Sequence, residues 1–366
     1  MEPQLPQDPA PPFVPNLAAV PEVSAYKDRS TGLTIYGIVE IILGGLSALL
    51  IPFMLLGAVF SRKIAGGGMP AGSYVSGICS YSFAAALLIT LGVGSIRARR
   101  WAWALNLILS WVWLIAGVIA TIGITVFMPG IFAASFRQAA SQSPDAPPVP
   151  TGVLAVVLTF MIVLMSVFLV LLPIAFLLFY RRKDVEETCK RRDPVERWTD
   201  RSPLPVLAVS VLFGCGAVYY LLLAVTTPLV PFFGRYLTGL PGSAALVVIA
   251  AVDLFLSISL YRLRLAAWWI AVGMVVLRMI SAILTFRRAD LLQAYSKMGW
   301  SQTQLQQMST NPGFRSGTVF LWWSVAFIAL FLGYLVWIKR YFRGPAAPGA
   351  LEPETPYSPP SAGPAL

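Results

Sequence analysis

Eight long apolar runs divide this sequence, and each is long enough to cross a lipid bilayer. An α-helix rises 1.5 Å per residue, so about 20 apolar residues span a hydrocarbon core of about 30 Å. We therefore expect an all-α integral membrane protein with eight transmembrane helices. The runs cover residues 33–59, 74–94, 102–127, 152–180, 205–229, 243–261, 266–286 and 317–338.

The composition agrees with this interpretation. Hydrophobic residues make up 57% of the chain and charged residues 12%, against about 45–50% and about 25% in soluble proteins. The first run follows a proline-rich segment and is longer than the apolar core of about 7–15 residues in a cleaved signal peptide. We therefore expect this run to be a transmembrane helix.

The distribution of lysine and arginine predicts which side of the membrane each loop faces. With a cytoplasmic N-terminus, 18 basic residues lie on the cytoplasmic side and 8 on the other, while Arg278 lies within a run. Because basic residues accumulate on cytoplasmic loops, we expect both termini in the cytoplasm, in a multi-pass protein of the plasma or inner membrane. The loop between residues 287 and 316 departs from the rule, since it carries four basic residues on the outer side.

A phrase of arginine and tryptophan occurs twice in the sequence. SIRARRWAWAL from Ser95 aligns with LYRLRLAAWWI from Leu260 at an offset of 165 residues, and each phrase joins one apolar run to the next. We infer a duplicated unit of four spans. Four is an even number, so both copies would face the same way, as a parallel repeat. The predicted organisation is a proline-rich tail (1–30), a first repeat (31–192), a second repeat (193–343) and a second tail (344–366).

The two phrases also supply candidate anchors to the membrane surface. Arginines that end one span can reach lipid phosphates, and tryptophans that open the next prefer the headgroup boundary. A specific site for an anionic lipid or substrate is the alternative interpretation. The candidate anchors are Arg97, Arg99, Trp101, Trp103, Arg262, Arg264, Trp268 and Trp269.

Only three acidic or basic side chains lie inside the runs: Glu40, Asp253 and Arg278. Each costs about 2.5–3.5 kcal/mol at a helix centre, so each needs a partner or water. Counted from the turn between their helices, Asp253 and Arg278 differ in depth by only about 4.5 Å. We expect them to pair, either to pin two helices together or to line a polar route through the bilayer.

Glu40 lies only about two helical turns into the first run. The simplest expectation is that its side chain turns toward the cytoplasmic edge, where Arg97 or Arg99 could meet it. The alternative is a cation or proton site within the helices.

Four segments outside the runs carry expectations of their own: the two tails, the link and one outer loop. Both tails are rich in proline and lack apolar periodicity, so we expect them to be disordered. The link at residues 181–203 is highly charged, and we expect a solvated connection, with an anionic lipid or a protein partner as the alternative. In the outer loop 289–312, Ser301 to Gln304 reads as a capping box that opens a short helix, either interfacial or a lid over a substrate.

The sequence weighs against an enzyme. It contains no histidine, its three cysteines form no C-x-x-C motif, and it has no signature for a nucleotide, haem or nicotinamide. We expect no cofactor, no metal and no catalytic residue, and the net charge of +11 is explained by cytoplasmic loops without nucleic acid. The expected role is a non-catalytic scaffold, assembly factor or regulator in the membrane. The alternative is a transporter or channel that uses Glu40, Asp253 and Arg278 in a midplane site.

Overall fold

The computed structural model describes residues 26–64, 71–142, 151–309 and 318–342. Apart from residues 26–30, the two tails expected to be disordered lie outside the described residues. The described part contains eight helical rods long and apolar enough to cross a membrane, which indicates a multi-pass membrane protein. The rods are α1 (Ser30–Ile64), α2 (Ala71–Ile96), α3 (Arg100–Gln142), α4 (Thr151–Ser166) continued by η1 (Val167–Leu171) and α5 (Leu172–Tyr180), α7 (Leu204–Thr226), α8 (Gly239–Tyr261), α9 (Leu265–Arg288) and α13 (Thr318–Ile338).

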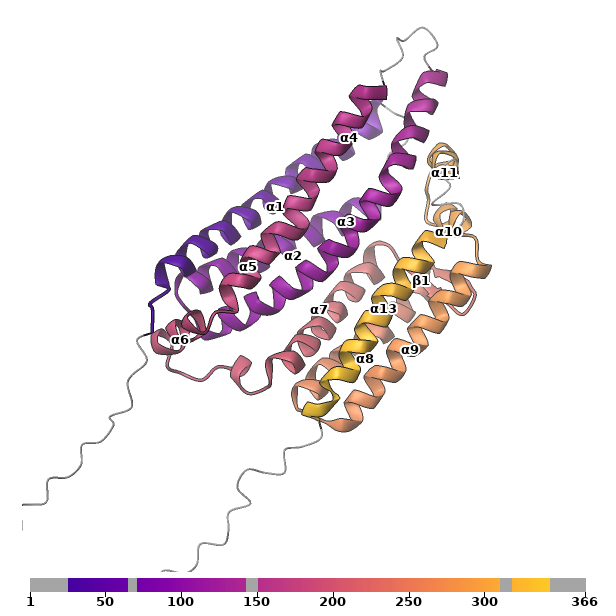
Figure 1. The fold of residues 1–366 in the computed structure, drawn as a ribbon. Coiled ribbons are helices and arrows are strands. Elements are labelled where there is room, and N and C mark those ends of the chain that lie inside the picture. The colour runs from indigo at the N-terminus through magenta and orange to yellow at the C-terminus, as the bar shows by residue number, and fades with distance from the viewer. Residues whose placement is uncertain (1–25, 65–70, 143–150, 310–317, 343–366) are drawn as a thin grey trace, which may run out of the picture.

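The rods form two groups of four (Figure 1). We call α1, α2, α3 and the α4–α5 rod the first bundle, and α7, α8, α9 and α13 the second bundle. In each bundle the first two helices pack along each other, as do the third and fourth. Helix α7 contacts α2 and α3, so the bundles meet along the first helix of the second one.

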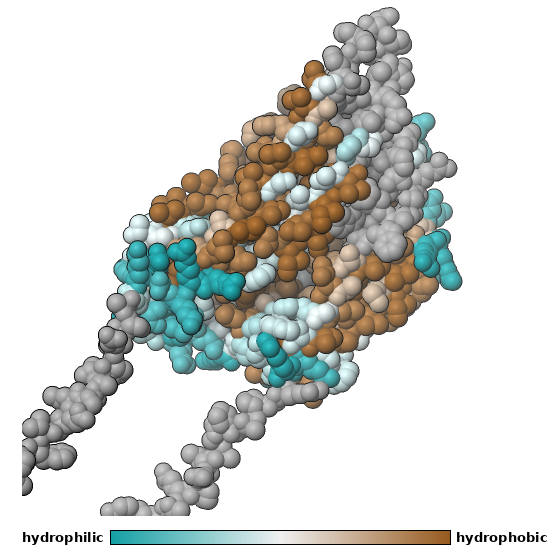
Figure 2. Space-filling view, viewed as in Figure 1, coloured by the Kyte–Doolittle hydropathy of each residue, from teal (hydrophilic) through white to brown (hydrophobic). Residues whose placement is uncertain are grey.

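Apolar side chains cover the flanks of both bundles (Figure 2). Among them, Phe53, Phe160, Val225 and Leu240 are each more than half exposed. Hydrophilic residues gather instead at the end of the molecule that carries the link between the bundles (Figure 2). A continuous apolar surface of this kind is unfavourable in water, whereas hydrocarbon suits it.

The fourth rod of the first bundle contains a π-helical turn, η1, which ends two residues before Pro173. Proline has no N–H to donate and crowds the preceding turn, so the regular helix is locally rearranged there. Gly117 of α3 faces this turn, and a Cβ on Gly117 would collide with the carbonyl oxygen of Leu169. The glycine therefore allows α3 to pack directly on the rearranged turn.

The two arginine-tryptophan phrases form turns of the same geometry, one between α2 and α3 and one between α8 and α9. Ala98 has φ 48° and Leu263 has φ 55°, so both lie in the left-handed region although neither is glycine. In both turns two successive amides donate back to the end of the preceding helix, which is the Schellman pattern of helix termination. The bonds are Ala98 to Ser95 and Arg99 to Gly94 in the first turn, and Leu263 to Leu260 and Arg264 to Ser259 in the second.

A β-hairpin follows α7, where the sequence gave no expectation of strands. Strands β1 (Leu229–Phe232) and β2 (Arg235–Thr238) pair antiparallel. Their two-residue loop, Phe233 and Gly234, has positive φ at both positions, as a tight hairpin turn requires. The hydroxyls of Ser281 and Thr285 on α9 accept from the amides of Phe233 and Gly234. The predicted span 205–229 consequently ends at Thr226, three residues early.

The short helices of the loops match the sequence only in part. A helix, α11 (Gln302–Ser309), begins directly after Ser301, where the sequence predicts one, and α10 (Leu291–Lys297) precedes it. Residues 130–142 continue α3 and form no separate helix. The link forms α6 (Lys183–Arg192) and the 3-10 turn η2 (Trp198–Asp200), and η3 (Lys339–Tyr341) ends the described chain.

The link, the two arginine-tryptophan turns and both ends of the described chain lie at one end of the molecule (Figure 1). An even number of rods separates the chain ends, so they return to the same side. We call this side the link face. It positions the charged residues discussed next.

Candidate functional site

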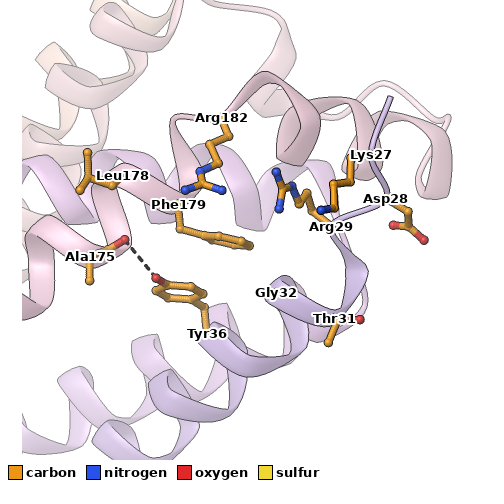
Figure 3. A pocket seen from close by; sticks show the side chains of 10 residues that line it. All are labelled: Lys27, Asp28, Arg29, Thr31, Gly32, Tyr36, Ala175, Leu178, Phe179 and Arg182. Carbon is orange, nitrogen blue, oxygen red and sulfur yellow. Dashed lines mark hydrogen bonds between the residues drawn. The ribbon is translucent and has the colours of Figure 1, made fainter. Parts of the chain in front are cut away.

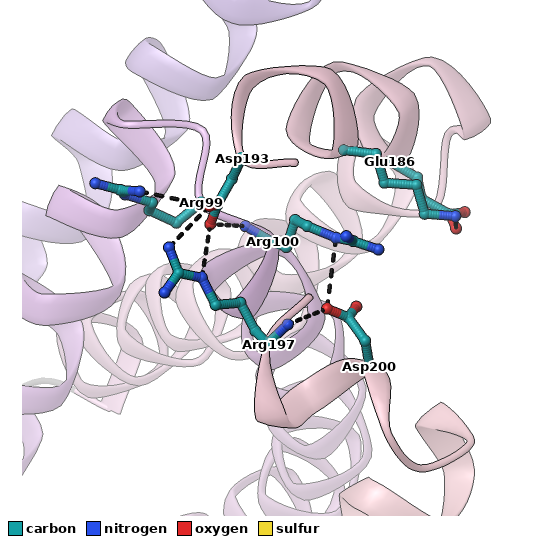
Figure 4. A network of polar contacts seen from close by, with 7 residues as sticks. Arg99, Arg100, Glu186, Asp193, Arg197 and Asp200 are labelled. Carbon is teal, nitrogen blue, oxygen red and sulfur yellow. Dashed lines mark hydrogen bonds and ion pairs between the residues drawn. The ribbon is translucent and has the colours of Figure 1, made fainter. Parts of the chain in front are cut away.

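The link is docked on the link face through Asp193, whose side chain is only 2% exposed. Arg197 donates to Asp193 Oδ1 from Nη2 at 2.8 Å, and the backbone N–H of Arg100 donates to Oδ2 at 3.4 Å (Figure 4). Arg99 forms a further ion pair at 3.5 Å. Arg100 is the first residue of α3, so Asp193 places a negative charge where the helix dipole favours one. The hydrogen bonds from Arg197 hold the pKa of Asp193 below its ordinary value.

Helix α6 also buries one side against the first bundle. Val185, Thr188 and Cys189 are buried, and burial raises the pKa of the Cys189 thiol to about 12. The backbone N–H of Arg29 donates to Thr188 Oγ1 at 3.2 Å, and its guanidinium pairs with Asp184 at 3.3 Å. The link is therefore solvated only in part, because one side of α6 packs on the link face.

A polar cluster is buried inside the first bundle, and we call Glu40, Ser95, Asn106 and Tyr180 the glutamate cluster. Each of its members comes from a different helix, and Glu40 is 1% exposed. Asn106 Nδ2 donates to Glu40 Oε2 at 3.2 Å and to the Tyr180 hydroxyl at 3.1 Å. The Tyr180 hydroxyl also lies 3.2 Å from Glu40 Oε1 and 2.6 Å from Ser95 Oγ. The cluster thus links α1, α2, α3 and α5.

This position differs from the one expected for Glu40. The carboxylate is buried and makes no hydrogen bond or ion pair with Arg97 or Arg99 within the described residues. The sequence reasoning missed Ser95, Asn106 and Tyr180 as partners. Neutral polar residues carry little signal in an apolar run, although Asn106 stands out because α3 has alanine and leucine on both sides of it.

The second bundle contains the predicted ion pair of Asp253 and Arg278. Arg278 Nη2 donates to Asp253 Oδ1, which joins α9 to α8. Asp253 is 1% exposed, whereas the Arg278 side chain is 27% exposed. The Arg278 guanidinium also lies over the ring of Tyr220 on α7, 5.5 Å from its centroid, a cation–π arrangement. Three helices of the second bundle therefore meet at this pair.

The three ionisable residues do not form one common site. Glu40 contacts helices of the first bundle, and Asp253 and Arg278 contact helices of the second. Within the described part of the chain, no hydrogen bond or ion pair connects the glutamate cluster to the Asp253–Arg278 pair. The glutamate cluster and the Asp253–Arg278 pair are therefore held by separate sets of helices.

Two basic cavities open on the link face. One, of about 590 Å³, lies between the start of α1 and the end of α5, where Tyr36 donates to the Ala175 carbonyl (Figure 3). Four charged residues line it, the basic Lys27, Arg29 and Arg182 and the acidic Asp28, and the rest of its lining is mostly apolar. The second, of about 480 Å³, lies at the first arginine-tryptophan turn, and its lining includes Arg97, Arg99, Trp101 and Arg197.

The eight candidate anchors occupy three kinds of position. Arg97, Arg262 and Arg264 are exposed on the link face, and Trp269 is 56% exposed beside them. Arg99 is paired with Asp193, and Trp101 lines the second cavity.

Trp103 and Trp268 differ from the position expected of a membrane-surface anchor. Both are buried, and their indole N–H groups donate to the carbonyls of Tyr180 and Leu335. Each therefore fixes the third helix of its bundle to the fourth.

Within the residues that the structure describes, no group of three or more Cys, Asp and Glu side chains is arranged to hold a metal ion. The chain matches no protein-family model, no curated protein and no solved structure.

Proposed function

We propose that the chain is a multi-pass membrane protein built from two parallel four-helix repeats. The support is the shared geometry of the two arginine-tryptophan turns, including a left-handed residue that is not glycine in each. Trp103 and Trp268 also make equivalent bonds to the fourth rod of their bundles. Helix pairs of independent origin are not expected to share both a left-handed residue in the turn and a hydrogen bond from a buried indole N–H.

In this proposal the link face is cytoplasmic and carries both termini, in the plasma or inner membrane. The excess of basic residues on the loops of this face supports that orientation.

The role that this architecture supports best is a non-catalytic scaffold, assembly factor or regulator. One observation carries it: Asp193 folds the link into a fixed, charged surface on the link face. A solvated connection does not need a buried aspartate with three arginine contacts. Such contacts give the link a fixed shape, which suits a surface presented to a partner. The proposed partners are a cytoplasmic protein at the link or the tails and anionic lipid headgroups at the cavities, and not nucleic acid.

The test is purification of the full chain from its native membrane, with a matched variant of the exposed side of α6. Glu186 and Lys190 form an ion pair four residues apart, at 2.6 Å. Exchanging them, as Glu186→Lys with Lys190→Glu, keeps the pair while reversing the charges shown to a partner. A stoichiometric protein that is retained by the wild type and lost by the variant supports the scaffold. Equal retention by both, or no bound protein with either, counts against it.

The cavity lined by Lys27, Arg29 and Arg182 is the proposed site for an anionic lipid headgroup. Asp184 neutralises Arg29, while Lys27 and Arg182 form no ion pair within the described residues. Protein in vesicles of phosphatidylglycerol and phosphatidylcholine should retain more phosphatidylglycerol, and Arg182→Gln should remove the preference. Unchanged retention by that variant would exclude this cavity.

A transporter or channel is the second candidate, favoured by two unpartnered atoms. Asn106 Oδ1 and Arg278 Nε are buried without a hydrogen-bond partner, each beside an acidic side chain. Such atoms could meet a passing ion or water. Proton flux into vesicles containing the full chain, followed with a pH-sensitive dye, tests this candidate. Flux that is lost in Arg278→Leu supports it, and flux no greater than that of empty vesicles rejects proton transport.

A further inference from the structure

The contacts of the glutamate cluster determine where its hydrogen atoms must lie. Ser95 Oγ is 3.1 Å from the carbonyl oxygen of Leu33. A carbonyl oxygen can only accept, so the Ser95 hydroxyl donates its single proton to Leu33. Ser95 then has no proton left for the Tyr180 hydroxyl, which is 2.6 Å away. In this assignment Tyr180 is the donor in that contact.

The same reasoning extends from Tyr180 to Glu40. The Tyr180 hydroxyl has one proton, which it donates to Ser95. It accepts from Asn106 Nδ2 at 3.1 Å. With that proton on Ser95, the remaining contact of Tyr180, 3.2 Å from Glu40 Oε1, is a hydrogen bond when the carboxyl group is the donor. An ionised Glu40 would instead take the Tyr180 proton, Ser95 would donate to Tyr180, and the contact with the Leu33 carbonyl would have no proton. Three oxygen–oxygen contacts in series need three protons, and the two hydroxyls supply two.

We propose that Glu40 is a proton-binding site and holds a proton on Oε1 at neutral pH. The neutral acid donates to Tyr180, Tyr180 donates to Ser95, and Ser95 donates to the Leu33 carbonyl. Glu40 Oε2 is then the carbonyl oxygen of the acid and accepts from Asn106. In this arrangement each hydrogen bond of the cluster has one donor and one acceptor. Hydrogen bonds that follow one another in such a series strengthen each other.

The surroundings of Glu40 favour the neutral form. The groups that face it are the side chains of Asn106 from α3 and Tyr180 from α5, with Ser95 from α2 behind Tyr180. No cation pairs with it within the described residues, unlike Asp253, which pairs with Arg278. An isolated charge is costly to bury in an apolar interior, whereas a protonated carboxyl with a donor and an acceptor beside it is not.

The series of hydrogen bonds begins and ends on α1. It starts about three turns inside α1 at Glu40, crosses α5 and α2, and returns to α1 at Leu33, in its first turn. The bound proton thus closes a loop among three helices near the link face. The inference does not depend on whether the protein is a scaffold or a transporter.

The test is infrared difference spectroscopy of the full chain in vesicles at pH 7. The carbonyl stretch of a protonated carboxylic acid is separate from the bands of a carboxylate. The wild type should show this band, and Glu40→Gln, which keeps the size of the side chain and an N–H donor, should lose it. Asp253→Asn is the matched control and should leave the band unchanged, because Asp253 is paired with Arg278.

A second variant keeps the test decisive if Glu40→Gln does not fold. Tyr180→Phe leaves the acid in place and removes its acceptor, so the band should persist at a shifted frequency. Thermal unfolding and gel filtration establish that each variant is folded. The proposal is overturned if the folded wild type lacks the band at pH 7, or if the band is the same in folded Glu40→Gln or in folded Tyr180→Phe.

Discussion

The first and second bundles bury side chains at matching positions but fill those positions with different chemistry. The indole bonds match Tyr180 of the first bundle with Leu335 of the second, and both residues are fully buried. The common turn geometry matches Ser95 with Leu260 and Asn106 with Ala271, and these four are buried as well.

Helix contacts extend the match to Glu40. Gly92 of α2 packs against the Gly37 carbonyl of α1, and Ser257, at the matching place on α8, donates to the Ser210 carbonyl of α7. Three residues beyond Gly37 is Glu40, and three residues beyond Ser210 is Phe213, which is 4% exposed. Every member of the glutamate cluster is therefore apolar in the second bundle.

The reverse holds for the ion pair. At the same offset, Asp253 and Arg278 of the second bundle correspond to Leu88 and Trp113 of the first. One helical frame thus accepts a polar or an apolar core at a given position, provided that each polar group has its partner within the bundle. Variants that carry residues from one bundle to the other test this interpretation.

The largest effect is expected from breaking the ion pair. Arg278→Ala leaves Asp253 buried without a cation, and Asp253→Ala leaves Arg278 unpaired, so each should lower the free energy of unfolding by about 3–5 kcal/mol. Arg278→Ala should cost more, because Asp253 is the more buried partner. The double variant should lose less than either single one. Unfolding in mixed detergent measures all three, and equal losses in single and double variants would argue against coupling.

A smaller loss is expected from Asn106→Ala, which installs the residue of the second bundle. It removes the donor to Glu40 and Tyr180 and should cost about 1–3 kcal/mol. Combining it with Glu40→Leu should cost less than the sum of the two single changes, because the group left unsatisfied is then gone. The reciprocal Ala271→Asn should also destabilise, since Val275 and Trp268 offer its amide no side-chain acceptor. Additive losses in the double variant would mean that the cluster does not act as a unit.

The sequence predicts the buried polar contacts of the second bundle but not those of the first, and the reason is physical. The rods were predictable because hydrocarbon requires about 20 apolar residues. The Asp253–Arg278 pair was predictable because opposite charges at matching depth have few other partners. The glutamate cluster was not, since Ser95, Asn106 and Tyr180 lie on three separate helices and their depth and facing depend on packing.

The docked link and the hairpin were missed for the same reason. The link resembles a solvated segment in composition, and its contacts with Arg99 and with the Arg100 amide, far away in the sequence, are what dock Asp193 on the first bundle. The hairpin turns at Phe233 and Gly234, whose amides donate to hydroxyls of α9 about 50 residues away. Local sequence carries no record of such long-range partners.

Helix spacing provides a further comparison of the bundles, with an expected loss of about 1 kcal/mol. Gly92→Ser gives α2 the residue that α8 carries at this place. A Cβ on Gly92 would lie 2.6 Å from the Gly37 carbonyl oxygen, so α1 and α2 must separate. Gly45→Ser is the control, because nothing lies within 4 Å of a Cβ there. If the two variants lose the same free energy of unfolding in detergent, close packing of α1 on α2 is not what Gly92 provides.

The smallest effect is expected at the link face. Asp193 pairs with the turn between α2 and α3, whereas the turn between α8 and α9 has no acidic partner within the described residues. The pKa of Asp193 is lowered chiefly by Arg197, so its contribution is complete above its unfolded value of about 3.9 and is lost as pH falls through the lower folded value. Amide hydrogen exchange of residues 183–200, corrected for intrinsic rates, should therefore rise below about pH 4 while the rods stay protected.

In Asp193→Asn the link should exchange faster already at neutral pH, and most of the acid dependence should disappear. A remainder is expected from Asp28, whose pKa is also lowered, first by the Ser30 amide. Arg264→Ala is the control, because Arg264 forms no ion pair within the described residues and its removal should leave exchange of the link unchanged. An acid-dependent rise as large in Asp193→Asn as in the wild type would mean that docking of the link rests on other contacts. The asymmetry between the two turns would then have no consequence for stability.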